Sequence, residues 1–150
     1  MLGVYSAALL EDYAHAAKSL GAKRVMVVAS RDGFDEISPC VPTDVFQINE
    51  DGKEYRYVIE PEKYGITNAD ASELAGGSGA ENAALAREVL DGGGRPTIKA
   101  AVALNAGAVL YISGRARTIK DGYDRAVAAI ADGTARAKLV DIVRASETLA

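Results

Sequence analysis

Two neighbouring carboxylates, Asp35 and Glu36, are the residues whose types and spacing best suit chemistry in this sequence. They lie in the stretch DGFDEIS at residues 32–38, just after the apolar run 24–29. Open α/β sheets commonly bind ligands beyond the ends of such strands. Mg²⁺ takes one or two protein carboxylates and completes its octahedron with water and phosphate oxygens. The pair therefore predicts a magnesium site; the alternative is solvated loop charges or residues of a helix's first turn.

Two other residues have side chains that could be reactive. His15, the only histidine, falls in a helical pattern beside Glu11 and Asp12, which favours a solvated helix residue over a catalytic one. Cys40, the only cysteine, has no obvious base near it in sequence, which favours a small space-filling residue over a nucleophile. We therefore expect no catalytic residue and, without a His/Cys cluster, no zinc site.

Two motifs have both a functional and a structural interpretation. The stretch GGSG at residues 76–79 could bind a phosphate, but it lacks the Gly-Lys-Ser/Thr ending of a P-loop, and Ser78 with Glu81 matches a helix capping box. Tyr55 and Tyr57 could stack bases, but they alternate as strand residues do. We favour a capped linker for the first motif and ordinary sheet packing for the second.

Composition limits the class of protein. The 150 residues are 49% apolar and 25% charged, as expected for one soluble globular domain. The formal charge of −4 argues against nucleic-acid or anionic-membrane partners. A single cysteine excludes an internal disulfide, and the N-terminus lacks a signal-peptide pattern. We therefore expect a cytoplasmic protein.

The element pattern predicts a mixed fold. Ser6 should cap a helix over 7–20, and the non-alternating run 24–29 should be a strand covered on both faces. Segments 43–48 and 54–60, joined through Asp51-Gly52, predict a β-hairpin. The fold class that follows is α/β, a layered sheet with parallel strand(s) plus a β-hairpin, packed by helices.

Four further helices are expected in the second half of the chain. They cover 79–91, 96 or 97 to about 113, 118–131, and from 134 or 135 onward. The second of them is apolar nearly all round but short for a membrane span. It is therefore expected to be a central buried helix, in which Asn105 must find hydrogen-bond partners.

Several stretches together resemble one family. They are GVY at 3–5, DGFDEIS at 32–38, PT at 42–43, ENA at 81–83 and LNAGAVLY at 104–111. Their order and spacing are similar to the C-terminal part of anthranilate phosphoribosyltransferase, across essentially the whole chain. The resemblance implies a fold of the nucleoside phosphorylase/phosphoribosyltransferase type. The family's upstream motifs (the glycine-rich phosphoribosyl-pyrophosphate loop and a Lys-His-Gly-Asn stretch) do not occur in this sequence. Residues 1–150 are thus expected to form a single α/β domain, the C-terminal portion of a longer phosphoribosyltransferase, and the abrupt apolar start at Leu2 agrees.

The resemblance also implies an activity and its ligands. The family transfers phosphoribosyl from phosphoribosyl pyrophosphate to the amine of anthranilate, in tryptophan biosynthesis. Its acidic pair falls on Asp35 and Glu36, where it helps to hold Mg²⁺ near the pyrophosphate. Substrate-binding residues stay unassigned because the main phosphate loop does not occur here. We expect this chain alone to be inactive and, because a partial domain exposes apolar surface, to form homo-oligomers.

The same loop departs from the family pattern at two places. Ala29-Ser30 stands where His-Gly is usual, and Pro39-Cys40-Val41 follows Ser38 in place of Leu-Thr-Gly. These changes alter the expected loop geometry and leave the acidic pair in place. Two alternatives stay open: a non-catalytic homologue that binds a partner or nucleic acid, and a relative of pyrimidine nucleoside phosphorylase. The DGFDEIS stretch argues against the second.

Overall fold

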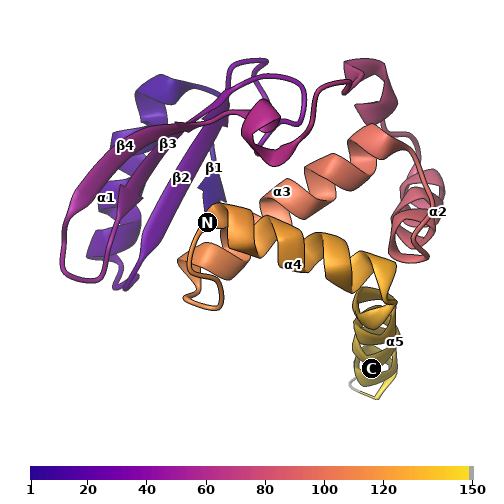
Figure 1. Ribbon diagram of the computed structural model, residues 1–150. Coiled ribbons are helices and arrows are strands. Elements are labelled where there is room, and N and C mark those ends of the chain that lie inside the picture. The colour runs from indigo at the N-terminus through magenta and orange to yellow at the C-terminus, as the bar shows by residue number, and fades with distance from the viewer. Residues whose placement is uncertain (149–150) are drawn as a thin grey trace.

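A four-stranded mixed sheet with helices on both faces forms the structured core of the chain in a computed structural model (Figure 1), which describes residues 1–148. The strands follow the order β1-β2-β3-β4. β1 pairs with β2 in parallel, and the other two pairs are antiparallel. This arrangement confirms the predicted sheet with parallel strand(s) plus a β-hairpin, although the sequence pattern did not predict the short strand β1 at Leu2–Gly3. The strand bounds are β1 Leu2–Gly3, β2 Val25–Ser30, β3 Thr43–Ile48 and β4 Glu54–Ile59.

The helices follow the predicted pattern with small shifts at their ends. Ser6 caps the first turn, as expected, but that turn is a 3₁₀ helix, so the predicted helix over 7–20 is split. Ser78 and Glu81 form the predicted capping box, and Thr118 accepts a hydrogen bond from the amide of Asp121. The α-helices are α1 Leu10–Ser19, α2 Gly79–Leu90, α3 Pro96–Ile112, α4 Ile119–Ala131 and α5 Thr134–Glu147. Short 3₁₀ turns are η1 Ala7–Leu9, η2 Pro61–Tyr64 and η3 Ala71–Leu74.

Strand β2 is covered on both faces, which explains why its apolar residues do not alternate with polar ones. Val25, Val27 and Ala29 belong to a buried cluster with α1. Met26 and Val28 belong to a second cluster, formed with α3 on the opposite face. Figure 1 shows α1 and α3 on the two sides of the sheet. A strand of this kind needs apolar side chains at every position.

Helix α3 packs between the sheet and α4, but it is not buried all round. Its buried residues are Thr97, Ala103, Leu104, Gly107, Ala108 and Ile112. Val102 and Val109 are 40% and 47% exposed. The prediction of a central buried helix is therefore wrong for the side that carries Val102 and Val109, because no described element covers them. Among the described helices, none combines the length and hydropathy that crossing a membrane requires.

The tyrosines of β4 serve the sheet, as the alternation predicted. The hydroxyl of Tyr57 donates to Oε1 of Gln47 at 2.7 Å, and its ring packs against the cluster on the α3 face. Gln47 is buried, and its Nε2 donates to Oδ1 of Asn49 at 2.6 Å and to the hydroxyl of Tyr111 at 3.3 Å. This network joins the hairpin to the end of α3.

Candidate metal centre

The acidic pair lies in the loop that connects β2 to β3. The two strands pair up to Ser30 and Thr43, so the loop leaves and re-enters the sheet at one end. Asp35 and Glu36 are both exposed and line one cavity of about 730 Å³. The other walls of this cavity are mostly apolar side chains of α2, α3 and the segment before α2. Two carboxylates thus share the edge of a largely apolar cavity.

Among the residues that the structure describes, neither carboxylate is neutralised by an ion pair. Within residues 1–148, no lysine, arginine or histidine forms an ion pair with Asp35 or Glu36. Across the same residues, no group of three or more His, Cys, Asp or Glu side chains is placed to hold a metal. Two carboxylates with room beside them are a donor set that suits Mg²⁺, because water and phosphate oxygens complete its octahedron. The residues present therefore fit this cation.

Asn105 of α3 binds the loop directly after the acidic pair. Its Oδ1 accepts a hydrogen bond from the amide of Ile37 at 3.0 Å. Its Nδ2 donates to the carbonyl of Ile37 at 2.9 Å and to that of Ala101 at 3.0 Å. These bonds supply the partners that Asn105 was expected to find. The side chain of Ile37 is buried in the cluster on the α3 face, so the loop is anchored to α3 by both backbone and side chain.

Asp32 closes the loop from the other side. Its carboxylate accepts hydrogen bonds from the hydroxyl of Ser30 and, at 2.7 Å, from the hydroxyl of Ser38. Partial burial acts to raise the pKa of Asp32, but the bonds from Ser30, Ser38 and the loop backbone outweigh it and lower this pKa below its ordinary value. The amide of Ser38 also donates to Oγ1 of Thr43 at 3.1 Å. Sequence reasoning missed these contacts; the hydroxyl and carboxyl residues at 30, 32 and 38 were their only signal.

Comparison with known proteins identifies the family to which this chain belongs. Residues 1–136 match the family described as "Glycosyl transferase family, a/b domain". The chain belongs to this family. The chain is 44% identical over 150 residues to the anthranilate phosphoribosyltransferase of Azorhizobium caulinodans. The aligned region covers 100% of this chain and 43% of that relative. The chain thus spans less than half the length of this relative.

Solved structures confirm the α/β fold of the glycosyl transferase domain. Anthranilate phosphoribosyltransferase from Thermus thermophilus superposes with a TM-score of 0.81 at 35% identity, over 96% of this chain and 42% of that one. The Saccharomyces cerevisiae enzyme in complex with PRPP and Mg gives a TM-score of 0.79 at 29% identity, over 91% of this chain and 39% of that one.

Of the other candidate residues, His15 and Cys40 do not line the cavity of the acidic pair, whereas Gly76 does. His15 of this glycosyl transferase domain is half exposed on α1, across the sheet from α3, with Nε2 3.4 Å from a carboxylate oxygen of Glu54. Cys40 is half-buried, and burial raises the pKa of its thiol, which favours the neutral form. Both positions agree with the structural interpretations. Gly76 lines the same cavity as the acidic pair, beside the capped start of α2.

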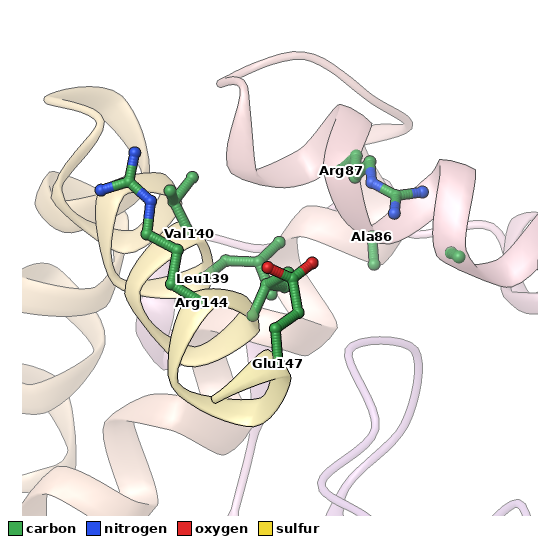
Figure 2. Close-up of a pocket in the computed structure, with 8 residues that line it drawn as sticks. Ala86, Arg87, Leu139, Val140, Arg144 and Glu147 are labelled. Carbon is green, nitrogen blue, oxygen red and sulfur yellow. The ribbon is translucent and has the colours of Figure 1, made fainter. Parts of the chain in front are cut away.

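A second groove lies between α2 and α5 (Figure 2). Its volume is about 510 Å³. Ala86, Leu139 and Val140 supply apolar surface, and Arg144 and Glu147 of α5 add opposite charges. It offers no pair of adjacent carboxylates. The acidic loop is therefore the candidate metal centre.

Proposed function

We propose that this chain is the C-terminal portion of an anthranilate phosphoribosyltransferase and supplies the metal-binding wall of its active site. The observation that carries the proposal is the placement of Asp35 and Glu36 on one cavity wall, with no ion-pair partner among residues 1–148. Two further facts support it. The relatives named above are anthranilate phosphoribosyltransferases, and one solved relative is described as a complex with PRPP and Mg.

The geometry suits a reaction in which the leaving group is an anion. When bound, Mg²⁺ would offset the charge that grows on pyrophosphate as the bond between ribose and pyrophosphate breaks. Asp35 and Glu36 would hold the cation. The apolar walls from α2 and α3 leave Asp35 and Glu36 as the charged side chains that line this cavity. This role needs no nucleophile from the chain, in keeping with a reaction in which the amine of anthranilate is the attacking group.

The first experiment tests whether the chain works as one portion of this enzyme. The purified chain is assayed with phosphoribosyl pyrophosphate, anthranilate and Mg²⁺, alone and together with the part of the Azorhizobium caulinodans relative that it does not span, fused or in trans. We expect no transfer by the chain alone and Mg²⁺-dependent transfer by the combination. Turnover by the chain alone would refute the proposal that the chain is only one portion of the enzyme. A folded combination without activity, beside an active intact relative, would refute the function.

The second experiment tests the acidic pair within the active combination. Asp35→Asn plus Glu36→Gln should lower turnover by about 10²-fold or more, the usual size of a lost electrostatic contribution at a developing charge. The matched control is Glu11→Gln plus Asp12→Asn, which neutralises another adjacent acid pair, on α1. The control should leave turnover and Mg²⁺ dependence unchanged. An equal loss in both double variants would remove Asp35 and Glu36 from the site.

A further inference from the structure

The acidic pair is held on both sides by side chains that are not themselves part of it. Asn105 binds both backbone polar groups of Ile37, the residue that follows Glu36. Asp32, on the other side, accepts from the hydroxyl of Ser38 and so closes a ring around residues 33–37. The two sets of hydrogen bonds come from different elements: those of Asn105 come from α3, and those of Asp32 come from the loop itself.

These hydrogen bonds affect the orientation of Asp35 and Glu36, which are exposed and carry two like charges. Fixing the backbone of a free loop costs conformational entropy. A loop already fixed before binding avoids this cost when the cation arrives. Groups that orient metal ligands through hydrogen bonds typically change metal affinity by about 10–100-fold. Here, the hydrogen bonds to Ile37 and Ser38 fix the backbone on the far side of Glu36.

We propose that Asp32 and Asn105 are positioning residues that hold Asp35 and Glu36 in one orientation toward a shared divalent cation. The inference deepens the proposed function and rests on it for the use of the cation. Asp32 acts through Ser38 and the loop backbone, and Asn105 acts through Ile37. Neither residue needs to touch the metal.

The structure separates positioning from direct ligation for Asp32. Asp32 is not among the residues that line the cavity shared by Asp35 and Glu36, and among residues 1–148 no group of three acidic, histidine or cysteine side chains is placed to hold a metal. Both of its carboxylate oxygens already accept hydroxyl hydrogen bonds, one from Ser30 and one from Ser38. An asparagine at this position can still accept from one hydroxyl and donate to the other. A positioning role therefore tolerates Asp32→Asn, whereas a role through charge does not.

The test is direct binding of Mn²⁺, used as a paramagnetic stand-in for Mg²⁺, to the full 150-residue chain, followed by electron paramagnetic resonance. We expect Asp32→Ala and Asn105→Leu each to weaken Mn²⁺ binding by about 10-fold or more. Asp32→Asn should restore most of the affinity. The control Asp121→Asn changes a hydrogen-bonded acid at the start of α4 and should bind as the unchanged chain does.

Each outcome decides one point. Weak binding by Asp32→Asn, equal to that of Asp32→Ala, would show that charge matters and overturn positioning by Asp32. Unchanged binding by Asp32→Ala and Asn105→Leu would overturn the proposal while leaving the metal site intact. Absence of Mn²⁺ binding by the unchanged chain would overturn the metal site and the positioning roles together. Should circular dichroism show that Asn105→Leu is unfolded, Asn105→Ser replaces it, since the shorter polar side chain also removes the hydrogen bonds to Ile37 and should weaken binding in the same direction.

Discussion

A Cβ atom on Gly3 would lie 1.5 Å from the backbone oxygen of Asp35. Strand β1 and the acidic loop therefore touch through their backbones, at a distance that only glycine permits. The loop thus contacts β1 at Asp35, in addition to its hydrogen bonds with Asn105 and Asp32. The first metal-ligand candidate thus depends on a residue 32 positions earlier in the chain.

The variant Gly3→Ala should displace the acidic loop. Because the neighbouring atoms belong to backbone, they cannot swing aside, and overpacking of this kind costs about 1–3 kcal/mol. We expect a lower free energy of unfolding in urea and weaker Mn²⁺ binding. Gly79→Ala is the control, since a Cβ there meets no atom within 4 Å. Equal stability and equal Mn²⁺ affinity of the two variants would contradict the contact.

The crossing of α3 and α4 should be equally intolerant of a side chain. A Cβ on Gly107 would lie 2.5 Å from the backbone nitrogen of Tyr123, and one on Gly122 would lie 2.2 Å from the carbonyl oxygen of Gly107. Gly122→Ala should therefore lower the free energy of unfolding by about 1–3 kcal/mol, although alanine favours helices. Thermal and urea unfolding measure the change. A more stable Gly122→Ala variant would show that the helices cross at a greater distance.

The hydroxyl of Tyr57 should make the stability of the fold depend on pH in the alkaline range. Burial raises the pKa of Tyr57 above its ordinary value of 10.0, with further contributions from Tyr111 and Tyr64. A group whose pKa is raised on folding contributes stability that is present below the unfolded pKa, here about 10, and is lost as the pH rises beyond it. The unchanged chain should thus lose stability above about pH 10.

Tyr57→Phe removes this dependence at a cost near neutral pH. Oε1 of Gln47 loses its hydrogen bond, which should lower the free energy of unfolding by about 1–2 kcal/mol at pH 7. Above pH 10 the gap between the variant and the unchanged chain should narrow. Tyr55→Phe is the control, because the side chain of Tyr55 is 43% exposed. A constant gap from pH 7 to pH 11 would rule out the titration of Tyr57 as its cause.

The apolar face of α5 should cause the chain to self-associate. Val140, Ile142 and Val143 are 42%, 59% and 45% exposed, and α5 buries none of its residues. Exposed apolar patches favour association. Sedimentation velocity at rising concentration should show species larger than a monomer, and Val140→Glu plus Val143→Glu should reduce them. Leu20→Glu, at an isolated site that is 90% exposed, is the control. A monomer at every concentration would contradict this prediction.

Local signals in the sequence were sufficient for most elements of the fold. The uninterrupted apolar run predicted a strand covered on both faces, and β2 is buried at all six positions. Asp51-Gly52 predicted the hairpin turn, and Ser78 and Thr118 predicted helix starts, because capping and turn residues act within a few positions of themselves.

Contacts between residues that are far apart in the chain could not be predicted from the sequence. Asn105 was known to need partners, but Ile37 is 68 positions away, and periodicity carries no information over such a distance. The exposure of Val102 and Val109 was missed for a related reason: an apolar helix reveals its hydrophobicity and not which neighbours cover it. The acidic pair was selected from its residue types, its place after an apolar run and the family resemblance, whereas the cavity beside it depends on α2 and α3.

The double coverage of β2 has a consequence for how the molecule opens. Val27 and Val28 point into separate clusters, so exposing the amides of this strand to solvent requires both clusters to come apart. Helix α5 contributes no buried residue and can detach without disturbing either cluster. Backbone amide protons in β2 should therefore exchange with solvent deuterium only through global unfolding, while those of α5 exchange through local fraying.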